Sequence, residues 1–269
     1  MAGRRVRVAI VGMGIGRPNG RALSKHPRAE VVALCDLEAE RMKEFAEELP
    51  GEVKCYTEYK KMCRDPDIDA VFVGTPNQLH VPVALEAVRR DKHVLVTKPL
   101  SDSERAAKRL VDAAESSGVV NMMSLSTRFG AASRYLGDLA RKGSMGDLYC
   151  GRARSIRRSG IPAWNMGFIR KGGGAFRDMG VHVLDAAWWI MGMPKPVSVT
   201  GVELPPIESE PSSSSSPSAL ASTPGSAIIP SIAAIHSSSD LYALGSAMEQ
   251  TTFSHIARAT RQRDTASAE

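Results

Sequence analysis

The stretch that decides the fold is VRVAIVGMGIGRPNG, residues 6–20. It opens with a short β-branched run, which predicts a buried strand. Gly12, Gly14 and Gly16 follow, and a helical pattern comes next over residues 17–25. Glycines at this point let the backbone turn sharply and approach a pyrophosphate, which then lies at the N-terminus of the helix. The stretch therefore predicts a strand, a dinucleotide-binding loop and a helix.

The glycine spacing is GxGxG, one residue shorter than the usual GxGxxG, so a plain strand–turn–helix cluster remains open. Asp36 supplies a second signal, because it ends the next apolar run, EVVALCD. An acid at this place can accept both hydrogen bonds of an adenosine ribose and would repel the 2′-phosphate of NADP. We therefore predict NAD as the cofactor and regard NADP as less favoured. The residues assigned to it here are Gly12, Gly14, Ile15, Gly16 and Asp36.

Strand and helix patterns alternate over residues 6–124, which indicates right-handed crossovers and a parallel, doubly wound sheet. After the first strand, the expected strands are EVVALCD, AVFVGTP, HVLVTKP and VVNMMSL. The predicted fold class is α/β. It comprises a Rossmann domain at residues 1–125, an incomplete α+β domain at 126–204 and a low-complexity tail at 205–269.

The pattern changes after the last of these strands. A helix is expected over residues 128–143, and another within GGGAFRDMGVHVLDAAWW, residues 172–189. Alternating sequences predict strands at 146–158 and 195–204. From Pro205 the chain is rich in serine and proline, so it has little apolar surface to bury and is expected to be disordered.

Composition argues against several classes of protein. The chain has 269 residues, of which 43% are hydrophobic and 24% charged, as in ordinary soluble globular proteins. The net charge of +6 is scattered and aromatic residues make up 5%, so no nucleic-acid surface is predicted. No segment reaches the roughly twenty apolar residues of a membrane span, and the first apolar run is too short for a signal peptide. The four cysteines have no metal-binding spacing, which favours reduced thiols and a cytoplasmic location.

Further polar residues follow the expected strands at their carboxyl ends, where such sheets bind ligands. Thr75, Asn77 and His80 come after AVFVG, and we assign them to contacts with the cofactor or a substrate hydroxyl. For His80, a structural contact with the backbone is an equal alternative. Lys98 ends HVLVTK, where partial burial would suit it to proton transfer and to contact with the cofactor. Its alternative is a solvated lysine at a strand exit.

Asp178, His182 and Asp185 are four and three residues apart, so on a helix they would lie on one side. From the residues alone, metal binding, proton transfer and helix capping all remain open. Two or three ligands on one helix without a cysteine partner are a weak case for a metal, and no metal site is predicted.

In order and spacing, these segments resemble the glucose–fructose oxidoreductase/inositol dehydrogenase (Gfo/Idh/MocA) family. The similarity runs from about residue 5 to 204, and STRFGAASRYLGDLARKGSMGDLYCGRARSIRR resembles the bridge between that family's domains. The resemblance implies an NAD(P)-binding Rossmann domain and an α/β domain whose open sheet commonly supports homo-oligomers. It also implies the interconversion of a secondary alcohol and a ketone on a sugar, cyclitol or similar polyol.

The family's signature lysine matches Lys98, and its Asp-x-x-x-His pair matches Asp178 and His182. The resemblance implies that His182 is the acid/base and that Lys98 lowers the pKa of the reacting alcohol. Asp178 would orient the substrate or Lys98. Asp185 would hold the imidazole tautomer or cap a neighbouring group.

The sequence departs from the family pattern at two places. Thr97 stands where the family usually has a glutamate, which removes a charge beside Lys98. Most of the family's large sheet corresponds to the part that is Ser/Pro-rich here, so we expect a truncated or divergent C-terminus. Two alternative functions follow: a catalytically impaired nucleotide-binding remnant or regulatory binder, and elimination or glycoside cleavage through transient oxidation.

Overall fold

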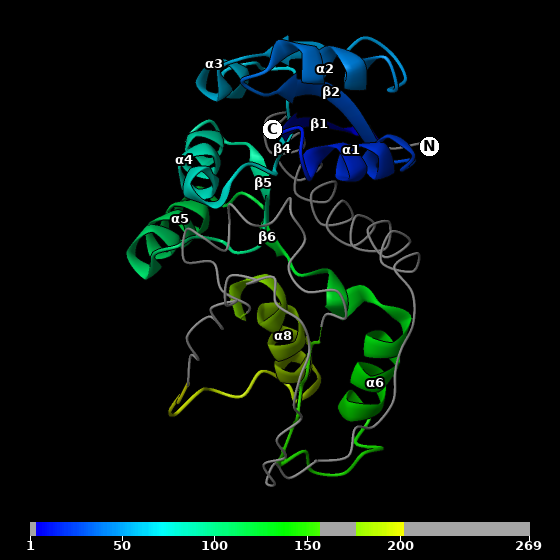
Figure 1. Cartoon of the computed structure of the whole chain (residues 1–269), viewed down its shortest axis with the longest axis vertical. Helices are drawn as coiled ribbons and strands as arrows, with labels where there is room; N and C mark the ends of the chain where they lie inside the picture. Colours follow the sequence, from blue (N-terminus) through cyan, green and yellow to red (C-terminus); the bar gives the residue numbers. More distant parts are fainter. Residues whose placement is uncertain (1–3, 157–175, 202–269) are drawn as a thin grey trace, which may run out of the picture.

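The computed structural model describes residues 4–156 and 176–201. Its first part is a six-stranded parallel sheet with the strand order β3-β2-β1-β4-β5-β6 (Figure 1). The strands are β1 (Val6–Val11), β2 (Ala29–Cys35), β3 (Lys54–Tyr56), β4 (Ala70–Val73), β5 (His93–Thr97) and β6 (Asn121–Ser124). The order reverses between β1 and β4, where doubly wound sheets open their ligand crevice. The predicted Rossmann fold is confirmed.

Helices cover both faces of the sheet (Figure 1). The helices α1 (Gly16–Ser24) and α2 (Ala39–Ala46) pack on one face, and α3 (Tyr59–Cys63), α4 (Asn77–Val88) and α5 (Glu104–Ser117) pack on the other. On the first face, Phe45 of α2 is fully buried in a cluster with Ile10 and Phe72 of the strands. Every residue of β4 and β5 is buried, as expected of strands covered on both faces.

The short elements β3 and α3 escape prediction from the sequence. β3 has three residues, two of them exposed, and therefore shows no alternation of apolar and polar side chains. α3 has five residues, fewer than a periodic pattern needs to become visible. By contrast, α5 ends where predicted, because Gly118 adopts the left-handed conformation (φ +66°) that closes a helix.

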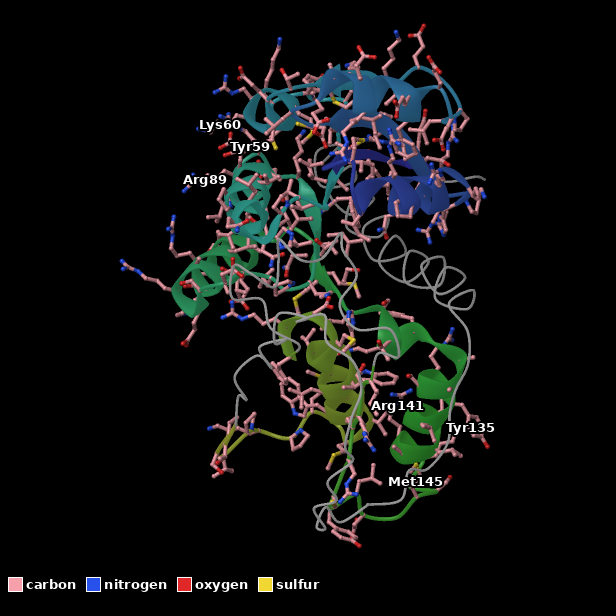
Figure 2. The ribbon with its side chains drawn as sticks, viewed as in Figure 1. Tyr59, Lys60, Arg89, Tyr135, Arg141 and Met145 are labelled. Atoms are coloured by element: carbon pink, nitrogen blue, oxygen red, sulfur yellow. The ribbon has the colours of Figure 1, made fainter. Side chains whose placement is uncertain are left out.

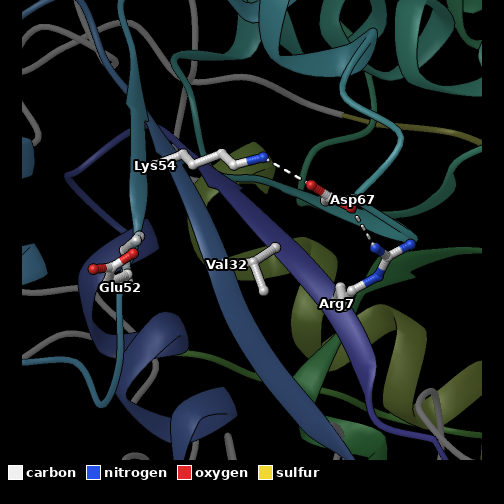
Figure 3. Close-up of a pocket in the computed structure, with 6 residues that line it drawn as sticks. Arg7, Val32, Glu52, Lys54 and Asp67 are labelled. Carbon is white, nitrogen blue, oxygen red and sulfur yellow. Dashed lines mark hydrogen bonds and ion pairs between the residues drawn. The ribbon is translucent and has the colours of Figure 1, made fainter.

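A cavity of about 560 Å³ opens near the amino ends of the strands (Figure 3). Val32 lines it and has no partner in β1, because the register between β1 and β2 shifts at this point. The charged side chains of the cavity pair with one another: Asp67 accepts from Arg7 at 3.0 Å and from Lys54 at 2.9 Å. The cavity lies away from the carboxyl ends of the strands, and its ion pairs fasten the loop before β4 to β1 and β3.

Beyond β6, the regular secondary structure of the described residues is helical. The elements are the 3₁₀ turn η1 (Ser126–Phe129), α6 (Ala131–Arg141), the π-helical turn η3 (Phe176–Gly180) and α8 (Val181–Ile190). α6 and α8 lie side by side beyond the β6 edge of the sheet (Figure 1). η3 leads directly into α8, so Asp178 and His182 belong to two different kinds of helical turn.

Gly137 and Arg141 of α6 pack against Trp189 of α8. A Cβ atom at Gly137 would lie 2.6 Å from the ring of Trp189, so only glycine fits there without rearrangement. The guanidinium of Arg141 stands 4.8 Å from the centre of the same ring. Arg141 therefore lies on the side of α6 that faces α8, whereas Tyr135 lies on the outer side and is exposed (Figure 2).

The two strands predicted beyond α6 are wrong for the residues that are described, 146–156 and 195–201, which have no regular secondary structure. Val197 and Val199 are 99% and 90% exposed. Alternating sequence alone does not make a strand, because a strand also needs a neighbour for its backbone hydrogen bonds. No described strand pairs with either segment. The predicted tail at 205–269 lies outside the described residues.

Candidate active site

The loops after β1 and β4 touch each other at the carboxyl edge of the sheet. Gly12 has a φ of +90°, and a Cβ atom there would lie 2.5 Å from the carbonyl oxygen of Gly74. Gly14 is different, because it is exposed and no atom lies within 4 Å of the place its Cβ would take. This open space adjoins the N-terminus of α1, which has no side-chain cap. Uncapped N–H groups beside open space can bind a phosphate.

Asp36 lies directly after β2, beside the glycine loop. Its Oδ2 accepts the N–H of Met13 at 2.6 Å, and its Oδ1 accepts the N–H of Glu38 at 3.1 Å. These two bonds fix the orientation of the carboxylate. A fixed, half-buried carboxylate at this edge suits the recognition of a ribose diol.

Thr75 and Asn77 lie at the carboxyl end of β4, where the loop enters α4. The hydroxyl oxygen of Thr75 is buried and has no hydrogen-bond partner. Asn77 is the first residue of α4 and is half-buried. Ile15, which is assigned to the same crevice, is half exposed and packs against Gly74. An unpartnered buried hydroxyl is costly, and the contact of Thr75 with a cofactor stays a prediction.

The structure favours the structural alternative for His80. The residue is 1% exposed, and its Nδ1 lies 2.7 Å from the carbonyl oxygen of Pro99. Its Nε2 lies 2.8 Å from the carbonyl oxygen of Thr75 and 3.1 Å from Oγ1 of Thr97. The ring therefore fills the space between the ends of β4 and β5 and is not available to a bound molecule. Of the two interpretations of His80, the geometry therefore favours the one in which the ring holds the backbone on either side of the site.

Lys98 and Asp178 meet although they are 80 residues apart in the chain. Nζ of Lys98 donates to the backbone oxygen of Asp178 at 2.8 Å and to its Oδ1 at 3.3 Å. Both side chains are mostly buried, with 22% and 13% exposed. The pair joins the end of β5 to the π-helical turn before α8, so the alternative of a freely solvated Lys98 does not describe this geometry.

His182 lies in the first turn of α8, close to this pair. Burial lowers the pKa of its imidazole, and the charge of Lys98 lowers the pKa further, against the opposing effect of Asp178 and Asp185. The imidazole is therefore neutral near pH 7 and able to accept a proton. Its Nδ1 is buried and has no hydrogen-bond partner. The site thus combines an ammonium group, a carboxylate and a neutral imidazole.

One of the two roles predicted for Asp185 was to hold the tautomer of the His182 imidazole. In the structure, Asp185 is bonded to Arg128. Its carboxylate forms a two-pronged ion pair with Arg128 of η1, with Nε of Arg128 at 2.6 Å from Oδ2 and Nη2 bonded to Oδ1. The sequence analysis missed Arg128. Its position directly after the last strand of the sheet is the signal that could have identified it, since that edge holds the other site residues.

The described residues contain no group of three His, Cys, Asp or Glu side chains arranged to hold a metal ion. Cys35 and Cys63 are buried, and burial raises the pKa of each thiol to about 12, so neither is a nucleophile near neutral pH. Among the described helices, none combines the length and apolarity needed to cross a membrane.

Comparison with known proteins identifies the family. Residues 6–125 match the model of an oxidoreductase family with an NAD-binding Rossmann fold, and residues 133–216 match the GFO/IDH/MocA C-terminal domain. The chain belongs to the Gfo/Idh/MocA oxidoreductase family. The family predicted from the sequence is therefore confirmed, and its two matched regions lie on either side of the Lys98–Asp178 contact.

Relatives in the Gfo/Idh/MocA family include a sugar dehydrogenase and a cyclitol dehydrogenase. The chain is 31% identical over 199 residues to D-glucoside 3-dehydrogenase of Escherichia coli, which covers 72% of this chain and 56% of that protein. It is 28% identical over 188 residues to myo-inositol 2-dehydrogenase of Thermotoga maritima, covering 70% and 55%. The chain thus spans little more than half the length of these curated relatives.

Solved structures of the family share the fold. One of them is scyllo-inositol dehydrogenase of Lactobacillus casei with bound NAD(H) and scyllo-inositol. It is 26% identical, with a TM-score of 0.62 over 70% of this chain and 57% of that one.

Proposed function

We propose that this chain is an NAD(P)-dependent oxidoreductase that interconverts a secondary alcohol and a ketone on a sugar, cyclitol or similar polyol. The observation that carries the proposal is the contact between Lys98 at the edge of the sheet and Asp178 in the turn that leads to His182. The names of the relatives in the family support the substrate class. NAD is preferred to NADP because Asp36 would repel a 2′-phosphate.

The residues present fit a dinucleotide cofactor. The open space at Gly14 and the uncapped N-terminus of α1 suit a pyrophosphate, and the carboxylate of Asp36 suits a ribose. The unpartnered hydroxyl of Thr75 gives the loop after β4 a free hydrogen-bonding group. Lys98 at the end of β5 completes the assigned set.

The side chains divide the work of alcohol oxidation. A bound nicotinamide would accept the hydride that leaves the carbinol carbon. Neutral His182 would take the hydroxyl proton, and the ammonium of Lys98 would stabilise the developing negative charge on the oxygen. Asp178 keeps Lys98 in place by accepting two of its hydrogen bonds. In the reduction direction, the protonated His182 would return the proton.

Cofactor binding is the first test of the proposal. Calorimetric titration of the full chain with NAD and with NADP should show binding of NAD, and Asp36→Ala should weaken it. A screen of polyols and sugars would then look for NADH production, with His182→Ala as the inactive control. Lack of binding to either cofactor would overturn the proposal.

A second candidate function is nucleotide binding without turnover. The observation that favours it is the exposure of large apolar side chains after α6, such as Tyr149, Val197 and Val199, each at least 90% exposed. NAD binding that Asp36→Ala abolishes, with no turnover of any polyol tested, would support this candidate. Tightly retained NAD with hydrolysis or elimination of a glycoside would point instead to transient oxidation.

A further inference from the structure

The Arg128–Asp185 ion pair joins the end of the sheet to the helix that carries His182. Arg128 lies in η1, four residues after β6 ends at Ser124. Asp185 lies in α8, three residues after His182. A displacement of the Asp185 end of the helix would therefore move the imidazole with it.

The geometry of the pair makes it specific. Two donors of one guanidinium meet two oxygens of one carboxylate, which fixes both distance and orientation. The side chains are 24% and 7% exposed, so little water competes for the contact. A lysine could keep the charge but not the two parallel hydrogen bonds.

The pair makes no hydrogen bond to Nδ1 of the imidazole. Both oxygens of Asp185 are bonded to Arg128, and Nδ1 of His182 has no hydrogen-bond partner. The pair therefore does not hold the imidazole tautomer through a hydrogen bond. What it can do is hold the helix.

Two other side-chain contacts with named partners hold α8 and the turn before it within residues 4–156 and 176–201. Asp178, in the turn before α8, is bonded to Lys98, and Trp189 near the C-terminal end of α8 packs on Arg141 of α6. α8 itself has only two buried residues, Asp185 and Ala186. Since its apolar residues are mostly only half-buried, a two-pronged ion pair from a buried carboxylate can contribute much to the position of the helix.

We propose that Arg128 and Asp185 are positioning residues, which fix α8 against the end of the sheet and so keep His182 beside Lys98. The pair acts on the helix and not on the reacting atoms. Its effect on turnover rests on the proposed function, whereas its effect on the placement of His182 does not.

The test measures the pKa of His182 by proton NMR in the full chain, with His182→Gln to assign its resonance. Among the residues that the structure describes, the charged groups around the imidazole are Lys98, which lowers its pKa, and Asp178 and Asp185, which raise it. Asp185→Asn distinguishes a loss of charge from a release of α8, because the two change the pKa of His182 in opposite directions. Loss of the carboxylate charge alone would lower the pKa of His182 further. Release of α8 would expose the imidazole and raise its pKa toward the ordinary value of about 6.5.

We expect the pKa to rise in Asp185→Asn and in Arg128→Gln, because burial is the largest effect on His182 and the charge of Asp185 the smallest of the four. Arg141→Gln is the matched control, since it removes another arginine that touches α8 but leaves the ion pair intact. It should change the pKa less. Arg128→Lys should give an intermediate value.

Hydrogen–deuterium exchange checks that the variants remain folded. In Asp185→Asn, peptides from α8 should exchange faster, while those from β4 and β5 stay as protected as in the parent chain. If the chain turns over a polyol, kcat should fall about tenfold to a hundredfold while KM for NAD stays within about twofold. A pKa that falls or stays constant, with unchanged exchange in α8, would overturn the proposal even if the chain proves to be an active oxidoreductase.

Discussion

The sheet of residues 6–124 and the helices α6 and α8 that follow it are stabilised in different ways. The sheet has an apolar layer on each face, with fully buried side chains such as Phe45, Phe72 and Ile10. The helices bury few side chains and are held by the Lys98–Asp178 and Arg128–Asp185 contacts and by the stacking of Arg141 on Trp189. The candidate site lies on the boundary: the glycine loop belongs to the half with two buried apolar layers, and the imidazole belongs to the half whose described side chains are mostly half-buried or exposed.

The largest effect should follow from breaking the apolar layer of the sheet. Phe45→Ala should lower the free energy of unfolding by about 4 kcal/mol, because it leaves a cavity in a fully packed cluster. Denaturant unfolding followed by circular dichroism would measure it. Trp189→Ala is the counterpart in the helices, and it should change the main unfolding transition by less than about 0.5 kcal/mol. Equal losses in the two variants would mean that the halves unfold as one unit.

The next largest effect should be on catalysis and not on stability. His182→Gln should slow polyol oxidation by about a hundredfold or more, because it removes the proton acceptor. In the parent chain, burial and the charge of Lys98 hold the pKa of His182 below its ordinary value. Because the neutral form is the active base, kcat/KM for oxidation should rise with pH through that lowered pKa and be flat above about 6.5.

A pH profile that continues to rise well above neutrality would assign the essential base to another group. The matched control for this prediction is His26→Gln, since His26 lies in the loop between α1 and β2, away from the site. Its substitution should leave the profile unchanged.

A smaller effect should come from the ion pairs at the opposite edge of the sheet. Burial alone would raise the pKa of Asp65, but hydrogen bonds from Tyr56 and Lys54 outweigh it and lower the pKa to about 2. Asp65→Asn should therefore destabilise the sheet by about 2 kcal/mol at neutral pH. Since the folded-state pKa is depressed, this contribution is present above the ordinary value of about 3.8 and is lost as pH falls toward 2. Unfolding of parent and variant at several pH values would show the difference shrinking, and a constant difference would contradict the prediction.

The smallest effect should come from Gly14, which differs from Gly12 of the same loop in whether a side chain fits. Gly14→Ala adds a methyl group to open space, so it should leave stability unchanged but weaken NAD binding by about tenfold. Gly12→Ala is the contrasting variant, because its φ of +90° and the nearby carbonyl of Gly74 make any side chain strained. It should destabilise the sheet by about 2 kcal/mol. Calorimetric titration and denaturant unfolding of both variants would test this, and loss of stability in Gly14→Ala would mean that the space is not open.

The same comparison explains what could be predicted from the sequence. The strands β1, β2, β4, β5 and β6 were predictable because each is an apolar run within a regular alternation. Residues 195–201 alternate as a strand would, yet they form none, because pairing depends on a partner that local sequence does not specify. The wrong prediction therefore falls in the half with little burial.

In the candidate site, too, some residues could be predicted from the sequence and some contacts could not. Lys98, Asp178 and His182 could be proposed because two lie four residues apart and the third ends a strand. The partnership of Asp185 with Arg128 could not, since the two residues are 57 positions apart and no pattern links them. A backbone contact of His80 was one of two equal alternatives, but its partners could not be predicted, because they are backbone oxygens of two separate loops.

The position of the tryptophans gives the helical half an optical signature of its own. Residues 6–124 contain no tryptophan, whereas Trp188 and Trp189 are neighbours in α8, and Trp164 lies outside the described residues. Trp188 donates to the backbone oxygen of Pro194 at 2.8 Å, so both indoles have defined surroundings. Tryptophan emission from the chain therefore contains nothing from the sheet and includes the helix that carries His182. Because reduced nicotinamide absorbs where indole emits, bound NADH would quench this emission by energy transfer. The extent of quenching would report the distance between the tryptophans and the cofactor.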